Sequence, residues 1–461
     1  RRGAAMGALK DVLRHPDEFY PLMRMYMAAQ AAKQLPKDPS LHFCYDMLNK
    51  VSRSFAIVIQ QLPVELRNAV CVFYLVLRAL DTVEDDMALS VKQKLPMLKR
   101  FHEKIYDRGF KFPCGDGHYA TLMEQMPLVV EAFLGLEDKY QEVIADITER
   151  MGAGMAEFIP KEVDTVSEYD LYCHYVAGLV GIGLSGLFAS CGLESEDYKE
   201  KDVLSNHMGL FLQKTNIIRD YLEDIEEEPA PRMFWPKEIW GHYAQELEDF
   251  KDAERREAAL ACLNHMITDA LQHVPYCMEY MAGLRHKWVF RFCAIPQVMA
   301  IGTLALCYNN GKVFEGVVKL RRGQTAKLMT GLHTFPDLLR SFLFFVGEIG
   351  ASVNPRVDPS ARETLERVEQ IENVCRELLR KGGAAGAPGE DSEPPPHPLV
   401  RLALWLLFAG YAMYAFSLKG MRESMGVNPA GGDPLIDRIQ QVVAIVLLLF
   451  ITHLAITGRR L

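Results

Sequence analysis

Hydrophobic residues recur at three- and four-residue intervals from about residue 9 to residue 380, and long alternating runs typical of strands are absent. Prolines divide this pattern into segments of helix length, at Pro63, Pro113, Pro127, Pro160, Pro236, Pro275 and Pro336. The pattern therefore predicts an all-α protein with one large helical domain over residues 1–380.

The composition changes after Arg380. Residues 381–398 are rich in Gly, Pro, Ala and acidic residues and predict a flexible linker. Residues 399–461 hold two apolar segments, 402–418 and 442–456, each near the lower end of the roughly 17–25 residues of a membrane span. Because they follow a linker and have no large surface left to pack on, we expect at least one of them to enter a membrane. Whether one or both do so stays open, and two buried helices are the alternative.

The acidic pattern Asp-x-x-Glu-Asp occurs twice in the helical region, at residues 81–85 and 220–224. In each copy the outer aspartates are four residues apart, so their carboxylates lie on one face of a helix. Such a pair costs a helix a few tenths of a kcal/mol unless a cation lies between the charges. Two copies predict facing helices that hold hard divalent cations, and Mg²⁺ on few carboxylates usually takes substrate phosphate as a further ligand. We therefore expect Mg²⁺ and diphosphate chemistry.

A single acidic run is more often a solvated helix face, but here polar residues continue each acidic stripe along the helix. The two stripes are Tyr74, Arg78, Asp81 and Asp85, and Gln213, Asn216, Asp220 and Asp224. They predict a lined cavity, with Arg78 and Arg219 available to phosphate oxygens. None of the thirteen histidines follows a Glu by three residues, which argues against a di-iron carboxylate site. Neither motif has the spacing of a calcium-binding EF-hand loop.

Charge and cysteine content narrow the function classes. The net charge of −9 argues against a general nucleic-acid binder, so we expect no nucleic-acid partner. The ten cysteines are scattered without a Cys-x-x-Cys pair, which is typical of a reduced, cytosol-facing protein without structural zinc. Residues 181–186 match the dinucleotide pattern G-x-G-x-x-G, but a helical segment precedes them and no strand–helix–strand unit surrounds them. Close helix packing, or room for a long ligand, is the better interpretation.

Five segments, in order along the chain, resemble the eukaryotic squalene synthases: Val51–Phe55, Tyr74–Asp86, Tyr172–Gly178, Gln213–Asp220 and Phe292–Gln297. The resemblance runs from about Gly7 to Arg322. It implies a single-domain isoprenoid-synthase helical fold, a monomeric catalytic domain facing the cytosol and a C-terminal anchor in the endoplasmic reticulum membrane. The implied reaction joins two farnesyl diphosphates head to head through presqualene diphosphate and reduces that intermediate to squalene with NADPH, or with NADH as an alternative.

The resemblance also implies a role for each matching residue. Five acids match the Mg²⁺–diphosphate ligands, where the metal assists loss of diphosphate: Asp81, Glu84, Asp85, Asp220 and Asp224. Tyr172 matches a proton-transfer residue, and Phe292 matches an aromatic ring beside the carbocation. Residues that match contacts to NADPH or phosphate are Arg53, Arg78, Asn216, Lys319 and Arg321. Without the resemblance, Tyr172 and Phe292 would be core residues and the basic cluster a solvated surface.

Two points stay open at this stage. Arg291 stands where the family pattern leads us to expect Asn, which leaves the local pocket shape undetermined. A phytoene-synthase-like enzyme would share the acidic motifs and need no reductant, and a non-catalytic helical membrane scaffold or isoprenoid-binding module is a further alternative. The basic cluster at residues 319–322 and the apolar tail favour a squalene synthase. The paired aspartates and Tyr172 argue against a non-catalytic protein.

Overall fold

The computed structural model describes residues 14–31, 35–228 and 231–382. The chain divides into two units, residues 1–20 with 391–461 and residues 21–390, and every predicted site residue lies in the second. Both apolar C-terminal segments, and the predicted linker beyond residue 382, fall outside the described residues. The domain boundaries and the number of membrane spans therefore stay predictions.

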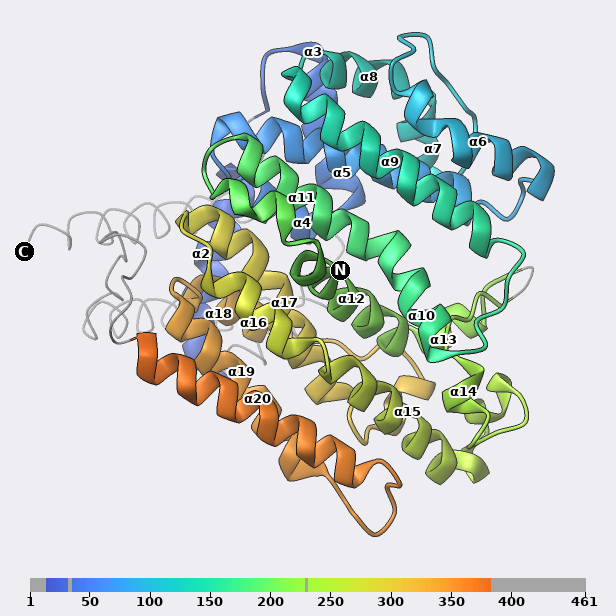
Figure 1. The fold of residues 1–461 in the computed structure, drawn as a ribbon, viewed down its shortest axis with the longest axis vertical. Helices are drawn as coiled ribbons and strands as arrows, with labels where there is room; N and C mark the ends of the chain where they lie inside the picture. Colours follow the sequence, from blue (N-terminus) through green and yellow to red (C-terminus); the bar gives the residue numbers. More distant parts are fainter. Residues whose placement is uncertain (1–13, 32–34, 229–230, 383–461) are drawn as a thin grey trace, which may run out of the picture. The chain divides into compact units, whose positions relative to one another are not determined.

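The described part of the chain contains helices and no strand, which confirms the all-α prediction (Figure 1). Four-to-twenty-two-residue α-helices are joined by short 3₁₀ turns (η1, η3 to η6) and one π-helical turn (η2). The elements are η1 (Pro16–Glu18), α2 (Phe19–Ala31), α3 (Pro39–Val51), α4 (Arg53–Ile59), α5 (Val64–Asp85), α6 (Val91–Lys104), α7 (Gly117–Glu124), α8 (Met126–Leu134), α9 (Asp138–Phe158), α10 (Val166–Cys173), η2 (His174–Gly178), α11 (Leu179–Ser190), η3 (Glu196–Glu200), α12 (Asp202–Arg219), α13 (Tyr221–Ile225), α14 (Lys237–Trp240), η4 (Leu247–Lys251), η5 (Ala253–Arg255), α15 (Arg256–Leu271), α16 (Val274–Ala282), α17 (Lys287–Cys307), η6 (Gly311–Phe314), α18 (Arg322–Gly331), α19 (Phe335–Ser352) and α20 (Ala361–Gly382).

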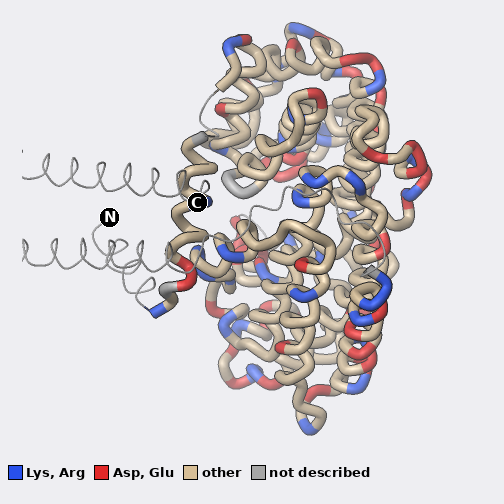
Figure 2. The backbone as a smooth tube through the Cα atoms, turned by 90° about the vertical axis from the view of Figure 1, so that its left-hand side faces the viewer, with Lys and Arg blue, Asp and Glu red and all other residues tan. Residues whose placement is uncertain are grey.

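Helix α12 lies in the middle of the second unit and packs against η2, α11, α15, α16 and α17 (Figure 1). Helix α5 packs against α3, α6, α8 and α9. Both α5 and α17 are apolar around most of their circumference, as expected of helices that are covered on several sides. Figure 2 shows acidic and basic residues interspersed over the turns of the outer helices on the side in view. The few charged residues inside the unit are therefore the ones that need an explanation.

Glycines bring the backbone of α12 close to those of η2 and α11. A Cβ built on Gly209 would lie 2.2 Å from the carbonyl oxygen of Ala177, and one on Gly181 would lie 2.3 Å from that of Ser205. Only glycine is compatible with such an approach. The G-x-G-x-x-G stretch at residues 181–186 is therefore part of a helix-packing surface, as its sequence context predicts, and does not form a nucleotide-binding turn.

Two helical stretches of the described residues are long and apolar enough to cross a membrane, residues 166–190 and 287–307. The second is α17, most of which is buried against neighbouring helices. Both stretches contribute residues to the hydrophobic core of the second unit.

Lys214 is a fully buried cation on the face of α12 that looks toward α10 and α15. Its ammonium group lies 2.6 Å from a carboxylate oxygen of Asp269 and 2.5 Å from one of Asp170. It also lies 4.9 Å from the ring centre of Tyr169. Burial raises the pKa of Asp269, and Lys214 opposes that shift. This ion cluster joins three helices behind the wall that carries the polar stripe of α12.

Replacement of Lys214 with Met is expected to lower the free energy of unfolding by about 3–5 kcal/mol, because it leaves buried carboxylate without a cation. Urea unfolding of the second unit, followed by circular dichroism, measures this change. Lys50→Met is the matched control, since Lys50 pairs with Asp46 at 2.7 Å on an exposed helix face; it should cost no more than about 1 kcal/mol. Equal losses for the two variants would contradict the assigned role of Lys214.

Candidate active site

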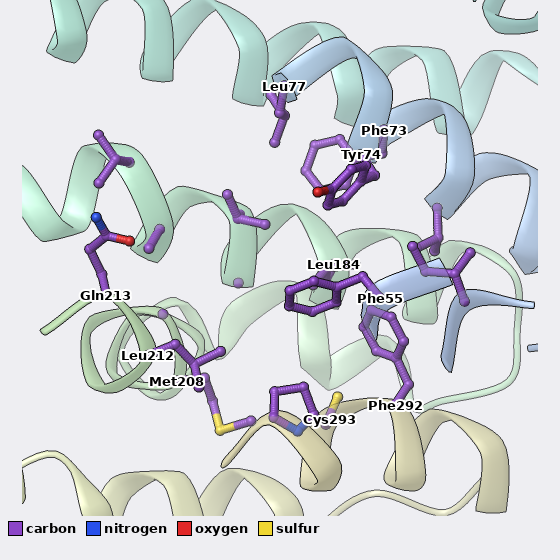
Figure 3. A pocket seen from close by; sticks show the side chains of 18 of the residues that line it. Phe55, Phe73, Tyr74, Leu77, Leu184, Met208, Leu212, Gln213, Phe292 and Cys293 are labelled. Carbon is purple, nitrogen blue, oxygen red and sulfur yellow. The ribbon is translucent and has the colours of Figure 1, made fainter. Parts of the chain in front are cut away.

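A cavity of about 260 Å³ lies between α4, α5, α11, α12 and α17. Figure 3 shows the labelled side chains of these helices pointing toward one another. Most of the lining is aromatic or aliphatic, including Phe55, Phe73, Tyr74, Leu77, Leu184, Met208, Leu212, Phe292 and Cys293. The polar lining comes mainly from the stripes of α5 and α12, through Arg78, Asp81, Gln213 and Asn216, with Gln297 from α17. Such a cavity fits a long apolar chain with a charged head group.

The stripe on α5 is positioned as its spacing predicts. Tyr74, Arg78 and Asp81 are separated by four and three residues and all line the cavity. The guanidinium of Arg78 lies 3.3 Å from the carboxylate of Asp81. Burial raises the pKa of Asp81 to about 6, although Arg78 opposes the shift. Asp85, the fourth member of the predicted stripe, is not part of the lining, because α5 ends there and its side chain is half exposed.

The last two acids of the first motif are bound to one arginine from a distant segment. Arg232 places one terminal nitrogen 2.8 Å from Glu84, and it donates a hydrogen bond from the other to Asp85. Burial raises the pKa of Glu84 to about 7 despite this cation. Lys94 closes the same turn by donating to the backbone carbonyl of Glu84 at 2.6 Å.

The second motif spans a break between two helices, which differs from the expected continuous helix. Asp220 caps the C-terminus of α12, and α13 starts at the next residue. The turn is kept, because the amide of Asp224 donates to the carbonyl of Asp220 at 3.0 Å. Arg219 binds the Asp220 carboxylate with two hydrogen bonds of 2.7 and 2.5 Å. Burial, with the Asp220 charge as the next contribution, raises the pKa of Asp224 to about 7.

The five predicted metal ligands fit Mg²⁺ by their chemistry. In the described ranges no three His, Cys, Asp or Glu side chains converge on one point. Four of these acids, Asp81, Glu84, Asp85 and Asp220, pair with arginines. All five supply hard carboxylate oxygens, the donors that Mg²⁺ prefers. The raised pKa values of Asp81, Glu84 and Asp224 show that burial leaves their negative charges incompletely balanced. A divalent cation would balance them.

Tyr172 is a buried residue of α10 beside the first acidic motif. Its ring stacks on Phe234 with 3.9 Å between the centres and contacts Phe158 at 5.4 Å. Its hydroxyl forms no hydrogen bond within the part of the chain that the structure describes. Burial raises the pKa of Tyr172 well above its usual value, and the charge of Glu84 adds to the shift.

Phe292 lines the cavity and packs edge-on against Phe188, with 5.9 Å between the ring centres. Its neighbour Arg291 points away from the cavity, toward α18. The Arg291 guanidinium donates to the carbonyl oxygens of Leu332 at 2.5 Å and Met329 at 3.0 Å. Arg291 therefore caps the C-terminus of α18. Its side chain does not contribute to the lining of the cavity, so it does not alter the shape of the pocket.

The residues predicted to contact NADPH or phosphate are not gathered in one place. Arg78 and Asn216 line the cavity. Lys319 and Arg321 are exposed on the segment between η6 and α18, and neither belongs to the lining. The side chain of Arg53 lies outside the described part of the structure. Their common role as a nucleotide site therefore stays a prediction.

Arg232 is a site residue that the sequence analysis missed. It lies eight residues after Asp224, in a segment that also places Phe234 on Tyr172. It also lines a second cavity, of about 690 Å³, together with Glu84, Lys94 and Phe234. The available signal was a lone arginine followed by aromatic residues, Arg-Met-Phe-Trp, shortly after an acidic motif.

Comparison with known proteins identifies the family of this chain. The squalene/phytoene synthase family model matches residues 48–324. "Squalene synthase LSS" from Botryococcus braunii is 55% identical over 431 residues, 93% of each chain. "Squalene synthase 1" from Arabidopsis thaliana is 56% identical over 81% of this chain and 90% of its own. The solved complex of TcSQS with the ligand BPH1237 has a TM-score of 0.72 at 47% identity, covering 74% of this chain and 99% of that one. The chain therefore belongs to the squalene/phytoene synthase family and, within it, to the eukaryotic squalene synthases.

Proposed function

We propose that the chain joins two farnesyl diphosphates head to head into presqualene diphosphate and then reduces this intermediate to squalene, with Mg²⁺ as the metal and NADPH, or alternatively NADH, as the reductant. The observation that carries the proposal is the apolar cavity whose polar lining comes from the stripes leading to the two acidic motifs. It offers an apolar space for isoprenoid chains beside carboxylates suited to metal-bound diphosphate. The relatives named squalene synthase support this reaction over that of a phytoene synthase or a non-catalytic scaffold.

The acids Asp81, Glu84, Asp85, Asp220 and Asp224 would hold the metal, which when bound neutralises the departing diphosphate. Arg78 and Asn216 are placed in the lining to orient the diphosphate by charge-assisted and neutral hydrogen bonds. The apolar walls exclude water, so that an allylic cation is not hydrolysed. The face of Phe292 stabilises positive charge by about 0.5–2 kcal/mol.

Tyr172 serves in proton transfer during formation of the cyclopropane ring. Its raised pKa keeps the hydroxyl protonated at neutral pH. A protonated phenol donates or relays a proton and is a weak base by itself. The acceptor of the proton is therefore a nearby anion, and Tyr172 positions the proton between the substrate and that anion.

The reductive step uses Lys319 and Arg321, with Arg53, for the phosphates of the nucleotide. The catalytic domain, residues 1–380, acts as a monomer on the cytosolic side of the endoplasmic reticulum. Residues 381–398 form a linker to the membrane anchor at 399–461. The apolar runs of this tail and the squalene synthase relatives support membrane attachment.

Incubation of the protein with farnesyl diphosphate and Mg²⁺, with and without NADPH, tests this function directly. We expect presqualene diphosphate to accumulate without the nucleotide and squalene to form with it. Substitution of EDTA for Mg²⁺ should stop both steps. A C30 product that forms equally well without a reductant would contradict the reductase assignment and favour the phytoene-synthase-like alternative.

A further inference from the structure

Arg232 is the cation that contacts both Glu84 and Asp85 of the first acidic motif. One terminal nitrogen of its guanidinium lies 2.8 Å from the carboxylate of Glu84, and the other donates a hydrogen bond to Asp85. Glu84 is 7% exposed and Arg232 is 21% exposed, so the pair is shielded from water on most sides. A guanidinium in such a place satisfies carboxylate oxygens that would otherwise be buried with unbalanced charge.

The same residue also touches the second motif through its backbone. The amide of Arg232 donates to the carbonyl of Asp224 at 3.0 Å. Arg232 thus links two motifs that are far apart in the sequence, by its side chain to one and by its main chain to the other. Replacement of its side chain leaves the backbone hydrogen bond in place, so the two contacts are separable by mutation.

The guanidinium and a divalent cation require the same oxygens. A carboxylate can share its oxygens among several partners, but Arg232 already provides the positive charge that a metal ion would bring to Glu84 and Asp85. We propose that Arg232 is an internal counter-ion that competes with the metal for the first acidic motif. The metal then binds this motif tightly only together with diphosphate, whose negative charge accepts the displaced guanidinium. This inference rests on the Mg²⁺ site of the proposed function.

The aromatic neighbours connect this exchange to Tyr172. The guanidinium of Arg232 lies 5.6 Å from the ring centre of Phe234, and that ring stacks on Tyr172 at 3.9 Å. Movement of Arg232 from carboxylate to diphosphate changes the charge next to this stack. Tyr172 therefore has the electrostatic environment of the proton-transfer step only after metal and diphosphate are both bound.

The competition has a thermodynamic signature. If Arg232 opposes the metal and diphosphate relieves the opposition, metal and diphosphate favour each other by the same factor, and allosteric factors of this kind are typically about 5–150-fold. Removing the guanidinium removes the opposition. The Arg232→Gln variant should therefore bind the metal tightly without diphosphate and gain less from adding it.

Mn²⁺ is a suitable probe, because it takes the same hard oxygen ligands as Mg²⁺ and is observed by electron paramagnetic resonance. The full chain in detergent is titrated with MnCl₂, alone and at a fixed concentration of inorganic diphosphate, with free Mn²⁺ measured in each sample. We expect Arg232→Gln to bind Mn²⁺ about tenfold more tightly than wild type without diphosphate, and the difference to shrink with it. Arg232→Lys keeps a positive charge beside the acidic motif and leaves fewer unbalanced charges than Arg232→Gln. Its Mn²⁺ affinity should lie between those of wild type and Arg232→Gln.

Lys161→Gln is the matched control. Lys161 lines the same second cavity, but its ammonium pairs with Glu168 at 3.2 Å and with neither acidic motif. It should bind Mn²⁺ as wild type does. Equal or weaker binding by both Arg232 variants, with native circular dichroism, would overturn the competition. Absence of Mn²⁺ binding in wild type both with and without diphosphate would overturn the metal site of the proposed function, and this inference with it.

Discussion

Replacement of Asp81 or Asp220 with Asn is expected to reduce the rates of presqualene diphosphate and squalene formation by roughly 10³-fold or more. Each substitution removes one carboxylate charge from a metal site, and the metal contributes several kcal/mol to ionisation of the diphosphate ester, where each 1.36 kcal/mol is about tenfold in rate. Both half-reactions begin by loss of diphosphate, so both should fail. Product formation from radiolabelled farnesyl diphosphate, with and without NADPH, provides the measurement.

Asp46→Asn is the control for this experiment. Asp46 lies on α3, is about two-fifths exposed and pairs only with Lys50 in the described contacts. This variant should keep wild-type rates. Near-normal turnover by either Asp81→Asn or Asp220→Asn would refute the assignment of the acidic motifs as metal ligands.

Simultaneous replacement of Lys319 and Arg321 with Ala is expected to separate the two steps. If these residues bind the nucleotide phosphates, the variant should form presqualene diphosphate at close to the wild-type rate. Loss of two charge-assisted hydrogen bonds of about 1.5–3 kcal/mol each should lower kcat/KM for NADPH by roughly 10²–10⁴-fold. Separate assays of the intermediate and of squalene give both numbers from one set of incubations.

The control pair is Lys312→Ala with Arg340→Ala, which removes the same charge from η6 and α19. Arg340 is exposed and pairs with Asp337 at 3.2 Å. This double variant should keep both activities. Equal loss of intermediate and squalene in the Lys319 and Arg321 variant would show that these residues belong to the condensation step.

The helical fold and much of the cavity follow from spacing within single helices. Tyr74, Arg78 and Asp81 line the cavity because residues three and four apart share a helix face, a rule that depends on sequence alone. Contacts between distant segments have no such rule. Arg232 binds Asp85 across 147 residues, and this pairing depends on how the chain around Arg232 folds back against α5.

Local backbone geometry is a second feature that the sequence pattern does not predict. The pattern predicts one continuous helix through residues 213–224, yet the chain breaks at Asp220. Arg219 and Asp220 bind each other across this break. Neighbouring residues on a regular helix face different directions, so this ion pair accompanies the break and spacing rules do not anticipate it.

Helix α12 approaches η2 at Gly209 and α11 at Gly181, so this wall of the cavity is held in place by main-chain contacts. Larger residues cannot reshape this wall, since a single added methyl group would lie 2.2–2.3 Å from a carbonyl oxygen. Adaptation to longer or shorter prenyl donors must then proceed through the opposite walls, where α5 and α17 contribute exchangeable side chains such as Leu77 and Cys293. Main-chain contacts therefore fix one wall of the cavity, and side chains that can be substituted form the opposite wall.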